Sequence, residues 1–254
     1  TVREIAGEKA GIIVPGVPVI YDGNDKDAAE VIAAKAKELG SPAYKVIQAG
    51  AKVLGNNKDG IDFSLEDDYY GDTRFHIPFI AWYQVMNASL ALTTMEVLKD
   101  RIPVTMEQLQ AGIANTRWQG RMETILPGVI VDGAHNEDGV RRFVETAERF
   151  QKEYPLTLLF SAVNDKDYQD MIHTICSRIK FRKVVTTEVG GYREVPSAEL
   201  AEIFCKEGCK DVGNSDNIEE AFHMAHEAKG EDGMLFCVGS LYLVGEIKTL
   251  LLKK

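Results

Sequence analysis

The sequence predicts an α/β protein whose C-terminal part is built on a mostly parallel sheet. From Val129 onward, short apolar runs alternate with amphipathic segments of helical period. Strands and helices that alternate in this way are typical of parallel sheets covered on both faces, because each right-handed crossover carries a helix. The region before this rhythm has shorter β-like runs separated by Gly, Asn and Asp. We therefore expect two domains, residues 1–105 and 106–254.

The N-terminal domain is expected to combine helices with hairpin or meander strands. Gly40 and Pro42 end its second helix. Thr105 and Gln108 form a capping pattern for its last predicted helix. The expected elements, in order, are an opening helix from Val2, a strand at 19–21, a helix at 27–39, β-like runs at 44–48, 61–65 and 74–77, and helices at 79–100 and 105–115.

The C-terminal domain is expected to alternate strands and helices to its end. Its strands are predicted from short apolar runs, and its helices from apolar residues that recur with helical period. The expected strands are 129–132, 156–161, 183–187, a weak one near 210–212, and 234–238. The expected helices are 137–152, 167–179, 197–207, 217–228 and 241–251.

Composition excludes several classes of protein. A net charge of −10 argues against general nucleic-acid binding, which needs clustered Lys and Arg. No apolar run approaches the roughly 20 residues that span a bilayer, and no signal peptide is recognisable. We expect a cytoplasmic monomer with no nucleic-acid or membrane partner. Because the chain starts at Thr1 within a helical pattern, we also expect it to be a piece of a longer protein.

The four cysteines, Cys176, Cys205, Cys209 and Cys237, are spread without the paired spacing of a metal site. We expect reduced thiols rather than disulfides or zinc ligands, as is usual inside cells. The histidines at 76, 173, 223 and 226 show no metal-binding pattern either, and we interpret them as structural.

The segment Asp132-Gly133-Ala134-His135-Asn136 follows the apolar run 129–131. Ligands of open α/β sheets bind outside the carboxyl ends of the strands, so Asp132 is placed to meet one. A carboxylate accepts two hydrogen bonds and suits the vicinal diol of a ribose. His135 and Asn136 add groups that can reach a phosphate or a carboxylate.

Further cations and a hydroxyl are candidates for the same site. Arg121 lies in the segment that joins the two domains, and its guanidinium suits phosphate oxygens, although a surface role is equally consistent. Lys166 follows the strand at 156–161, which we expect beside the strand of Asp132, and could bind a carboxylate substrate. Ser240 is either a helix N-cap or a ligand contact as well. Arg193 is a weaker candidate.

Two candidates lie in the N-terminal domain. Lys9 either neutralises the C-terminal end of the first helix or, once carbamylated, ligates magnesium as a carboxylate does. Gln84 and Asn87 are three residues apart and share a helix face. Their amides either read an adenine edge or face solvent.

The order of these motifs is more specific than any one of them. Along the chain, Glu-Lys-Ala-Gly-Ile is followed by Gln-x-x-Asn-Ala, Trp-x-Gly-Arg-x-Glu, Asp-Gly-Ala-His-Asn, Asp-Lys-Asp and Gly-Ser-Leu-Tyr-Leu-Val-Gly-Glu. This order resembles folylpolyglutamate synthase and dihydrofolate synthase of the Mur ligase superfamily, from Thr1 to the last helix. The resemblance implies an incomplete Mur-ligase-like central domain followed by a Rossmann-like C-terminal domain.

The resemblance also implies a reaction and a set of site residues. Members of the family use ATP and Mg²⁺ to convert a folate carboxylate into an acyl phosphate, which the amino group of L-glutamate attacks. The positions that match the family's functional residues are Lys9 for the carbamylated lysine at magnesium, Asn87, Arg121 and Asp132 for the base, phosphate and ribose of ATP, and His135, Lys166 and Ser240 for glutamate.

The chain departs from the family in one major respect. It lacks the phosphate-binding loop of the Gly-Thr-x-Gly-Lys-Gly-Ser type, which supplies much of the grip on a triphosphate. We therefore expect the 254-residue chain to be inactive although its parent is a tetrahydrofolylpolyglutamate synthase. Ala81-Trp82-Tyr83 also replaces a stretch in which the family often has Gly. The alternatives are a bifunctional dihydrofolate synthase, a ligase of nucleotide-linked muropeptides, or a non-catalytic binding module.

Overall fold

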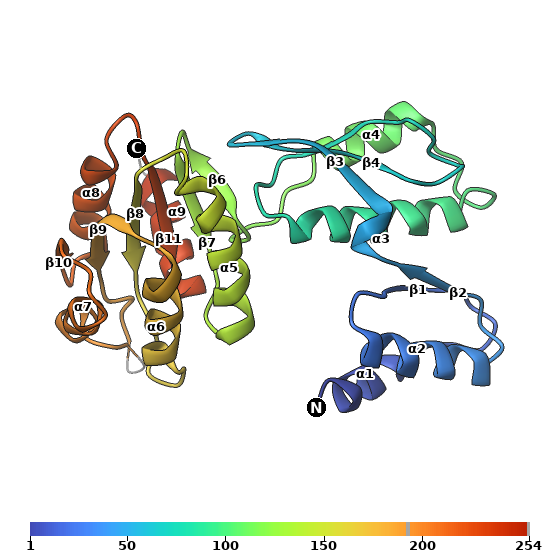
Figure 1. The fold of residues 1–254 in the computed structure, drawn as a ribbon, viewed down its shortest axis with the longest axis horizontal. Helices are drawn as coiled ribbons and strands as arrows, with labels where there is room; N and C mark the ends of the chain where they lie inside the picture. The colour runs from blue at the N-terminus through green and yellow to red at the C-terminus, as the bar shows by residue number, and fades with distance from the viewer. Residues whose placement is uncertain (192–193, 253–254) are drawn as a thin grey trace. The chain divides into compact units, whose positions relative to one another are not determined.

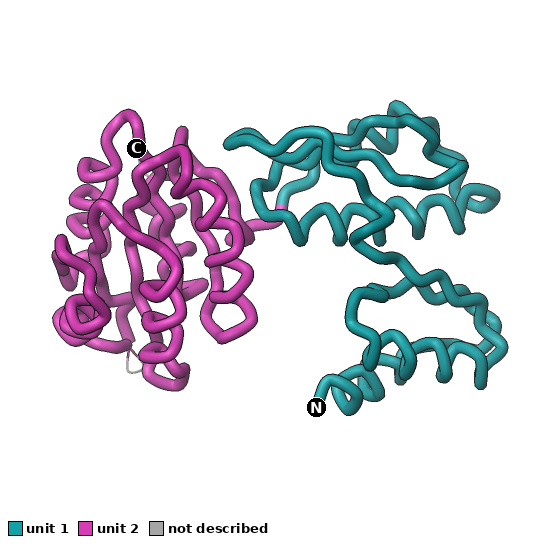
Figure 2. The backbone as a smooth tube through the Cα atoms, in the orientation of Figure 1, with its two compact units in different colours: residues 1–117 teal, residues 118–254 magenta. Residues whose placement is uncertain are grey.

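The computed structural model describes residues 1–191 and 194–252, which form two compact units (Figure 2). Unit 1 is Thr1–Arg117 and unit 2 is Trp118–Lys254. The division falls after Arg117. The sequence had suggested a boundary after residue 105. The reason is that helix α4, Met106–Ala114, packs against strand β5, Phe75–Ile77, of unit 1.

Unit 1 contains two small sheets and four helices among its described residues (Figure 1). Strands β1 and β2 pair in parallel, whereas β3, β4 and β5 form an antiparallel sheet. Helix α3 packs against strands of both sheets. The other bounds are α1 Val2–Ala10, β1 Val19–Asp22, α2 Lys26–Glu38, β2 Ala43–Val46, a 3-10 turn Gln48–Gly50, β3 Ala51–Asn57, β4 Gly60–Leu65 and α3 Tyr83–Val97.

Most of the helices, strands and caps predicted for unit 1 are present in the structure. The predicted capping pair is present, since Thr105 Oγ1 accepts the Gln108 N–H and the Gln108 side chain accepts the Thr105 N–H. The opening helix has a capping box as well, between Thr1 and Glu4. Strand β3 was missed, and α3 begins at Tyr83 rather than at residue 79. Between β5 and α3, residues 79–81 are buried without being helical.

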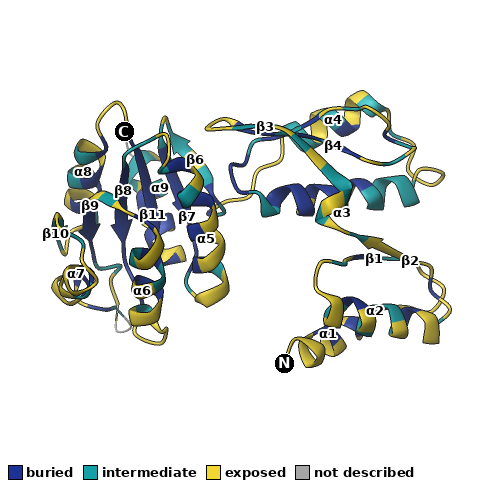
Figure 3. Cartoon of the chain, in the orientation of Figure 1, coloured by how far each residue is buried: buried dark blue, intermediate teal, exposed yellow. Residues whose placement is uncertain are grey.

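The core of unit 1 lies between the antiparallel sheet and helices α3 and α4. Alternate residues of β4 belong to this core. In Figure 3, helix α3 beside it is coloured mostly as buried or intermediate. Tyr70 is also buried there, and its hydroxyl donates to the Leu92 carbonyl at 2.7 Å. This core fixes the helix that carries Gln84 and Asn87.

Unit 2 is a six-stranded sheet in the order β10-β9-β8-β11-β7-β6, parallel except for β6 (Figure 1). The predicted parallel sheet is therefore confirmed, while the antiparallel edge strand β6, Glu123–Leu126, was missed. The other strands are β7 Val129–Asp132, β8 Leu156–Phe160, β9 Phe181–Thr186, β10 Val212–Asn214 and β11 Met234–Val238.

Helices cover both faces of this sheet. Phe143 of α5 and Phe204 of α7 contact Phe236 and Phe160 on one face. Residues of α8 and α9 pack against Val131, Leu159 and Cys237 on the other. The helices are α5 Glu137–Phe150, α6 Tyr168–Arg178, α7 Ser197–Lys206, α8 Ile218–Lys229 and α9 Leu241–Leu252.

None of the helices in the described residues is long and apolar enough to cross a membrane.

Candidate functional site

Three strands of unit 2 end in one row at the carboxyl edge of the sheet. Val238 of β11 is paired with Asp132 of β7 on one side and with Phe160 of β8 on the other. The loops that follow these strands therefore start side by side. They carry most of the site residues predicted for this unit.

The loop after β11 passes very close to the loop after β8. A Cβ atom on Gly239 would lie 2.0 Å from the Ser161 carbonyl oxygen, and the φ of Gly239 is +112°. Only glycine fits such a position, because other residues clash there and are strained at this φ. The backbone itself thus brings residues 161 and 239 together.

Asp132 is buried and fixed by the backbone. Its Oδ2 accepts the Met122 N–H and its Oδ1 accepts the Ala134 N–H, both at 2.8 Å. Burial raises the pKa of Asp132 to about 6, although these two hydrogen bonds and the charges of Arg121 and His135 oppose the rise. Each carboxylate oxygen keeps acceptor capacity for a ligand hydroxyl. Asp132 therefore ties two loops together at the edge of the sheet.

The turn that contains Arg121 is held from several sides. The Gly120 carbonyl accepts the Gly133 N–H at 2.8 Å, and the Gly120 N–H donates to Glu123 at 2.8 Å. Lys248 of α9 forms an ion pair with Glu123 at 2.7 and 3.0 Å, and both side chains are largely buried. Arg121 itself is half-buried and contributes its charge toward Asp132. The backbone around the guanidinium is thus well fixed.

Met122 holds this turn in an unusual conformation. Its φ is +46°, and within the described ranges Met122 is the only non-glycine residue with a positive φ. The side chain is nevertheless fully buried. The left-handed conformation costs about 1–2 kcal/mol for such a residue, and here it directs the Met122 N–H at Asp132.

His135 is oriented by the backbone of its own loop. Its Nδ1 lies 2.7 Å from the Gly133 carbonyl oxygen. A carbonyl only accepts, so Nδ1 carries the proton and Nε2 is left to face other groups. Asn136, by contrast, is the N-cap of α5, and its side chain accepts the Gly139 N–H at 2.9 Å. The capping role uses the Asn136 oxygen that we had considered for a ligand.

The expected neighbourhood of Lys166 was wrong. We placed its strand, β8, beside the strand of Asp132, but β11 lies between them. Lys166 is exposed in the loop before α6, where Asp167 caps the helix by accepting the Asp170 N–H. Lys166 therefore starts from a loop one strand further from Asp132 than expected.

Ser240 occupies the intervening position. It is buried between β11 and α9, and its Oγ accepts the Tyr242 N–H at 3.1 Å at the start of α9. The capping interpretation is thus confirmed, and the second, ligand-binding interpretation stays a prediction. Arg193, the weaker candidate, lies outside the described residues.

Ser161 is a polar residue that sequence reasoning missed. It follows β8 and is fully buried, and its Oγ has no hydrogen-bond partner among the described residues. Buried hydroxyls are nearly always bonded, so an unpaired one at a ligand edge is informative. The signal that could have found it is a serine directly behind a run of apolar residues, ahead of Asp165-Lys166-Asp167.

The remaining predicted site residues belong to unit 1. Lys9 is exposed in the last turn of α1. Asn87 is exposed on α3, and its Nδ2 donates to Gln84 Oε1 at 2.8 Å. Gln84 is buried, and its Nε2 has no partner in the described part of the chain. The two amides therefore share one helix face, as predicted, and one amide nitrogen remains available.

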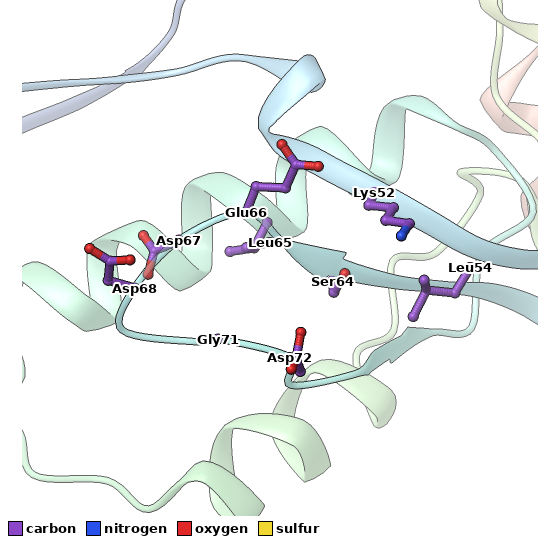
Figure 4. Close-up of a pocket in the computed structure, with 9 residues that line it drawn as sticks. All are labelled: Lys52, Leu54, Ser64, Leu65, Glu66, Asp67, Asp68, Gly71 and Asp72. Atoms are coloured by element: carbon purple, nitrogen blue, oxygen red, sulfur yellow. The ribbon is translucent and has the colours of Figure 1, made fainter.

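A separate pocket of about 660 Å³ lies beside β3 and β4 of unit 1 (Figure 4). None of the predicted site residues borders it. Asp67 on its wall accepts the Tyr69 and Tyr70 N–H groups at 2.7 and 3.1 Å, which is a turn-forming role. The residues that line it are Lys52, Leu54, Ser64, Leu65, Glu66, Asp67, Asp68, Gly71 and Asp72.

Within residues 1–191 and 194–252, no three His, Cys, Asp or Glu side chains are arranged to hold a metal ion.

The sequence pattern of one protein family covers most of unit 2. The family described as Mur ligase, glutamate ligase domain, matches residues 120–241. Unit 2 is therefore similar to a Mur ligase glutamate ligase domain. The matched range begins at Gly120 and ends at Leu241, so the Arg121 turn, Asp132, His135 and Ser240 all lie within it.

Relatives extend the similarity to the whole chain. The dihydrofolate synthase/folylpolyglutamate synthase of Bacillus subtilis is 30% identical over 261 residues, which are 98% of this chain and 58% of that protein. The crystal structure of folylpolyglutamate synthase from Thermotoga maritima matches with a TM-score of 0.81 and 26% identity, over 99% of this chain and 58% of that one. A structure described as an FPGS–AMPPCP complex matches with a TM-score of 0.73 and 27% identity, over 99% and 57%.

The chain is thus homologous to folylpolyglutamate and dihydrofolate synthases over almost its whole length, and it spans 58% of the Bacillus relative. The similarity to the glutamate ligase domain lies in unit 2, and the similarity to the synthases continues through unit 1.

Proposed function

We propose that this chain supplies the glutamate ligase domain and part of the ATP-handling domain of a ligase that adds L-glutamate to folate. The observation that carries the proposal is the row of loops at the carboxyl edge of unit 2. There the Arg121 turn, buried Asp132, His135 and Ser240 are held by backbone contacts inside the matched family range. The relatives named as synthases of folates support the substrate class.

The side chains of this edge suit a nucleotide. When bound, ATP supplies the activation of the folate carboxylate. Asp132 retains acceptor capacity for ribose hydroxyls, and Arg121 provides a forked donor for phosphate oxygens. The AMPPCP complex of a relative is consistent with a nucleotide in this family. In unit 1, the unpaired Gln84 Nε2 beside Asn87 suits an adenine edge.

We assign the incoming L-glutamate to His135, Lys166 and Ser240. The Nε2 of His135 is directed by the bond from Nδ1 to Gly133, so its position is set before a ligand binds. Lys166 is an exposed cation that suits a carboxylate of glutamate. The unpaired Ser161 hydroxyl, in the loop that passes close to Gly239, adds a donor to the same edge.

We propose Lys9 as the carbamylated lysine. Its exposure at the end of α1 leaves the amine open to carbon dioxide. Magnesium is implied by the resemblance to the family. A ¹³C-NMR signal of a carbamate on the chain in labelled bicarbonate, absent from the Lys9→Ala variant, tests the assignment.

The test of the proposed function uses both the 254-residue chain and the full-length gene product. We expect the full-length protein to transfer L-glutamate to tetrahydrofolate with ATP. We expect the 254-residue chain to be inactive, since its sequence has no Gly-Lys phosphate-binding loop. Activity of the chain alone would contradict this expectation. Failure of both proteins with every folate would favour a non-catalytic binding module.

The second candidate function is a bifunctional dihydrofolate synthase. The name of the Bacillus relative combines both activities, which favours testing it. Dihydropteroate and tetrahydrofolate are offered separately to the full-length protein. Product with both acceptors indicates the bifunctional enzyme, and product with tetrahydrofolate alone indicates the synthase of polyglutamates.

A further inference from the structure

Unit 2 brings together two cysteines that are far apart in the sequence. The Sγ atoms of Cys176 and Cys209 lie 3.6 Å apart. Cys176 belongs to α6, and Cys209 follows α7 just before β10. Spacing along the chain gave no indication of this pairing. All four cysteines are free in the structure.

The backbone on both sides of the pair is fixed. The Cys209 N–H donates to the Phe204 carbonyl at 3.0 Å, which ties Cys209 to the last turn of α7. One turn before Cys176 on the same helix, His173 Nδ1 lies 2.9 Å from a Glu207 carboxylate oxygen. The contact between His173 and Glu207 therefore holds α6 against the turn that carries Cys209. The fold itself therefore places the two thiols next to each other.

The two thiols differ in reactivity. The pKa of Cys209 is lowered because the Cys176 thiol donates a hydrogen bond to its thiolate, while burial and the Glu207 carboxylate oppose the effect. The pKa of Cys176 is raised, first by its hydrogen bond with Cys209 and then by burial. Both residues are half-buried, so a small oxidant can reach them. The thiolate, which is the reactive form, is thus favoured on Cys209.

We propose that Cys176 and Cys209 are a redox modification site that forms a reversible disulfide with a peroxide oxidant. The Cys209 thiolate attacks hydrogen peroxide and becomes a sulfenic acid, with release of hydroxide that takes up a proton as water. The Cys176 thiol then attacks that sulfur, forming the S–S bond and releasing a second water. Two thiols are oxidised and one peroxide is reduced to two waters.

The site is independent of the ligand edge. Cys176 lies near the C-terminal end of α6, whereas Lys166 precedes the N-terminal end of the same helix. Cys209 precedes β10, so it lies at the amino edge of the sheet. The disulfide therefore staples α6 to the end of α7, and its expected effect is on the stability of unit 2. The inference does not rest on the proposed function.

The other two cysteines provide internal controls. Cys205 is exposed but lies in α7 itself, and Cys237 is fully buried in β11. The Cys205→Ser variant keeps the proposed pair and removes the accessible competitor. The Cys176→Ser and Cys209→Ser variants each remove one partner, and circular dichroism checks that they fold.

The experiment treats the Cys205→Ser chain with a small excess of hydrogen peroxide, blocks the remaining thiols under denaturing conditions and maps the peptides by mass spectrometry. We expect a peptide that joins Cys176 to Cys209, reversible by dithiothreitol. We expect a rise of roughly 10 °C in the Tm of unit 2, from the loop that the bond closes. Two results would overturn the proposal. The first is sulfinic acid on either cysteine without the joined peptide. The second is the loss of two thiols when the Cys176→Ser or Cys209→Ser variant is treated with peroxide.

Discussion

The buried carboxyl group of Asp132 should make the stability of unit 2 depend on pH in an unusual direction. Its pKa is about 6 in the folded chain against an ordinary value of 3.8. Between these values the folded chain holds a proton that the unfolded chain has lost. By linkage, the free energy of unfolding falls as the pH rises through this window and is level above it. This is the reverse of the usual behaviour of a paired aspartate.

The magnitude follows from the difference between the two pKa values. It corresponds to about 3 kcal/mol in full, of which about 2 kcal/mol develops between pH 4.5 and 7.5. The perturbation is Asp132→Asn, which cannot ionise. Asn offers only one acceptor oxygen, so either the Met122 or the Ala134 N–H loses its partner. That loss costs about 1–3 kcal/mol and is independent of pH.

Urea unfolding at several pH values, followed by circular dichroism, separates the two contributions. We expect the stability of the wild-type chain, relative to Asp132→Asn, to fall by about 2 kcal/mol from pH 4.5 to 7.5. Asp62→Asn in unit 1 is the control. Burial raises the pKa of Asp62, but Arg74 and His76 outweigh this and leave it lowered, so the trend reverses, with stability lost as the pH falls. A constant difference between wild type and Asp132→Asn would refute the reasoning.

Four further substitutions test the packing of the loops and of two helices. Gly239→Ala should cost at least about 2 kcal/mol through its clash with Ser161, whereas Gly245→Ala, with open space, should stabilise α9 by about 0.5–1 kcal/mol, both measured as Tm shifts. Thr105→Ala should cost about 1 kcal/mol in urea unfolding through the lost cap. Glu123→Gln should raise the KM of the full-length protein for ATP roughly fivefold by loosening the Arg121 turn, and an unchanged KM would exclude that role.

Local structure was largely predictable from the sequence, because local signals were strong. Strand β7 was located correctly at both ends, since four apolar or buried residues stand between Gly128 and the turn at Gly133. Strand β6 was missed because Glu123–Leu126 is only partly buried at an edge and lacks a regular alternation. Strand β3 was missed for a similar reason, since it includes exposed polar residues and a bulge near Gly55.

The positions of segments that are distant in the sequence were harder to predict. The order of strands is set by packing between distant segments, so nothing near Lys166 indicated that β11 would separate β8 from β7. The same limit applies to Cys176 and Cys209, whose contact arises from the packing of α6 on the turn after α7. Residue types at strand ends predicted where the candidate site lies, whereas burial and hydrogen bonding decided how each side chain is held. Asp132 is the clearest case, because no sequence signal showed that both of its oxygens accept backbone N–H groups.

Transfer of labelled L-glutamate by the full-length gene product is the measurement that most directly tests whether the carboxyl edge of unit 2 serves an ATP-dependent folate ligase. We expect label on tetrahydrofolate only in the presence of ATP. His135→Ala and Asp132→Ala should each lower kcat/KM by at least about tenfold, or about 1.4 kcal/mol, while Gly245→Ala leaves it unchanged. Full activity of the His135 and Asp132 variants, or label transferred only to a nucleotide-linked peptide, would contradict the account.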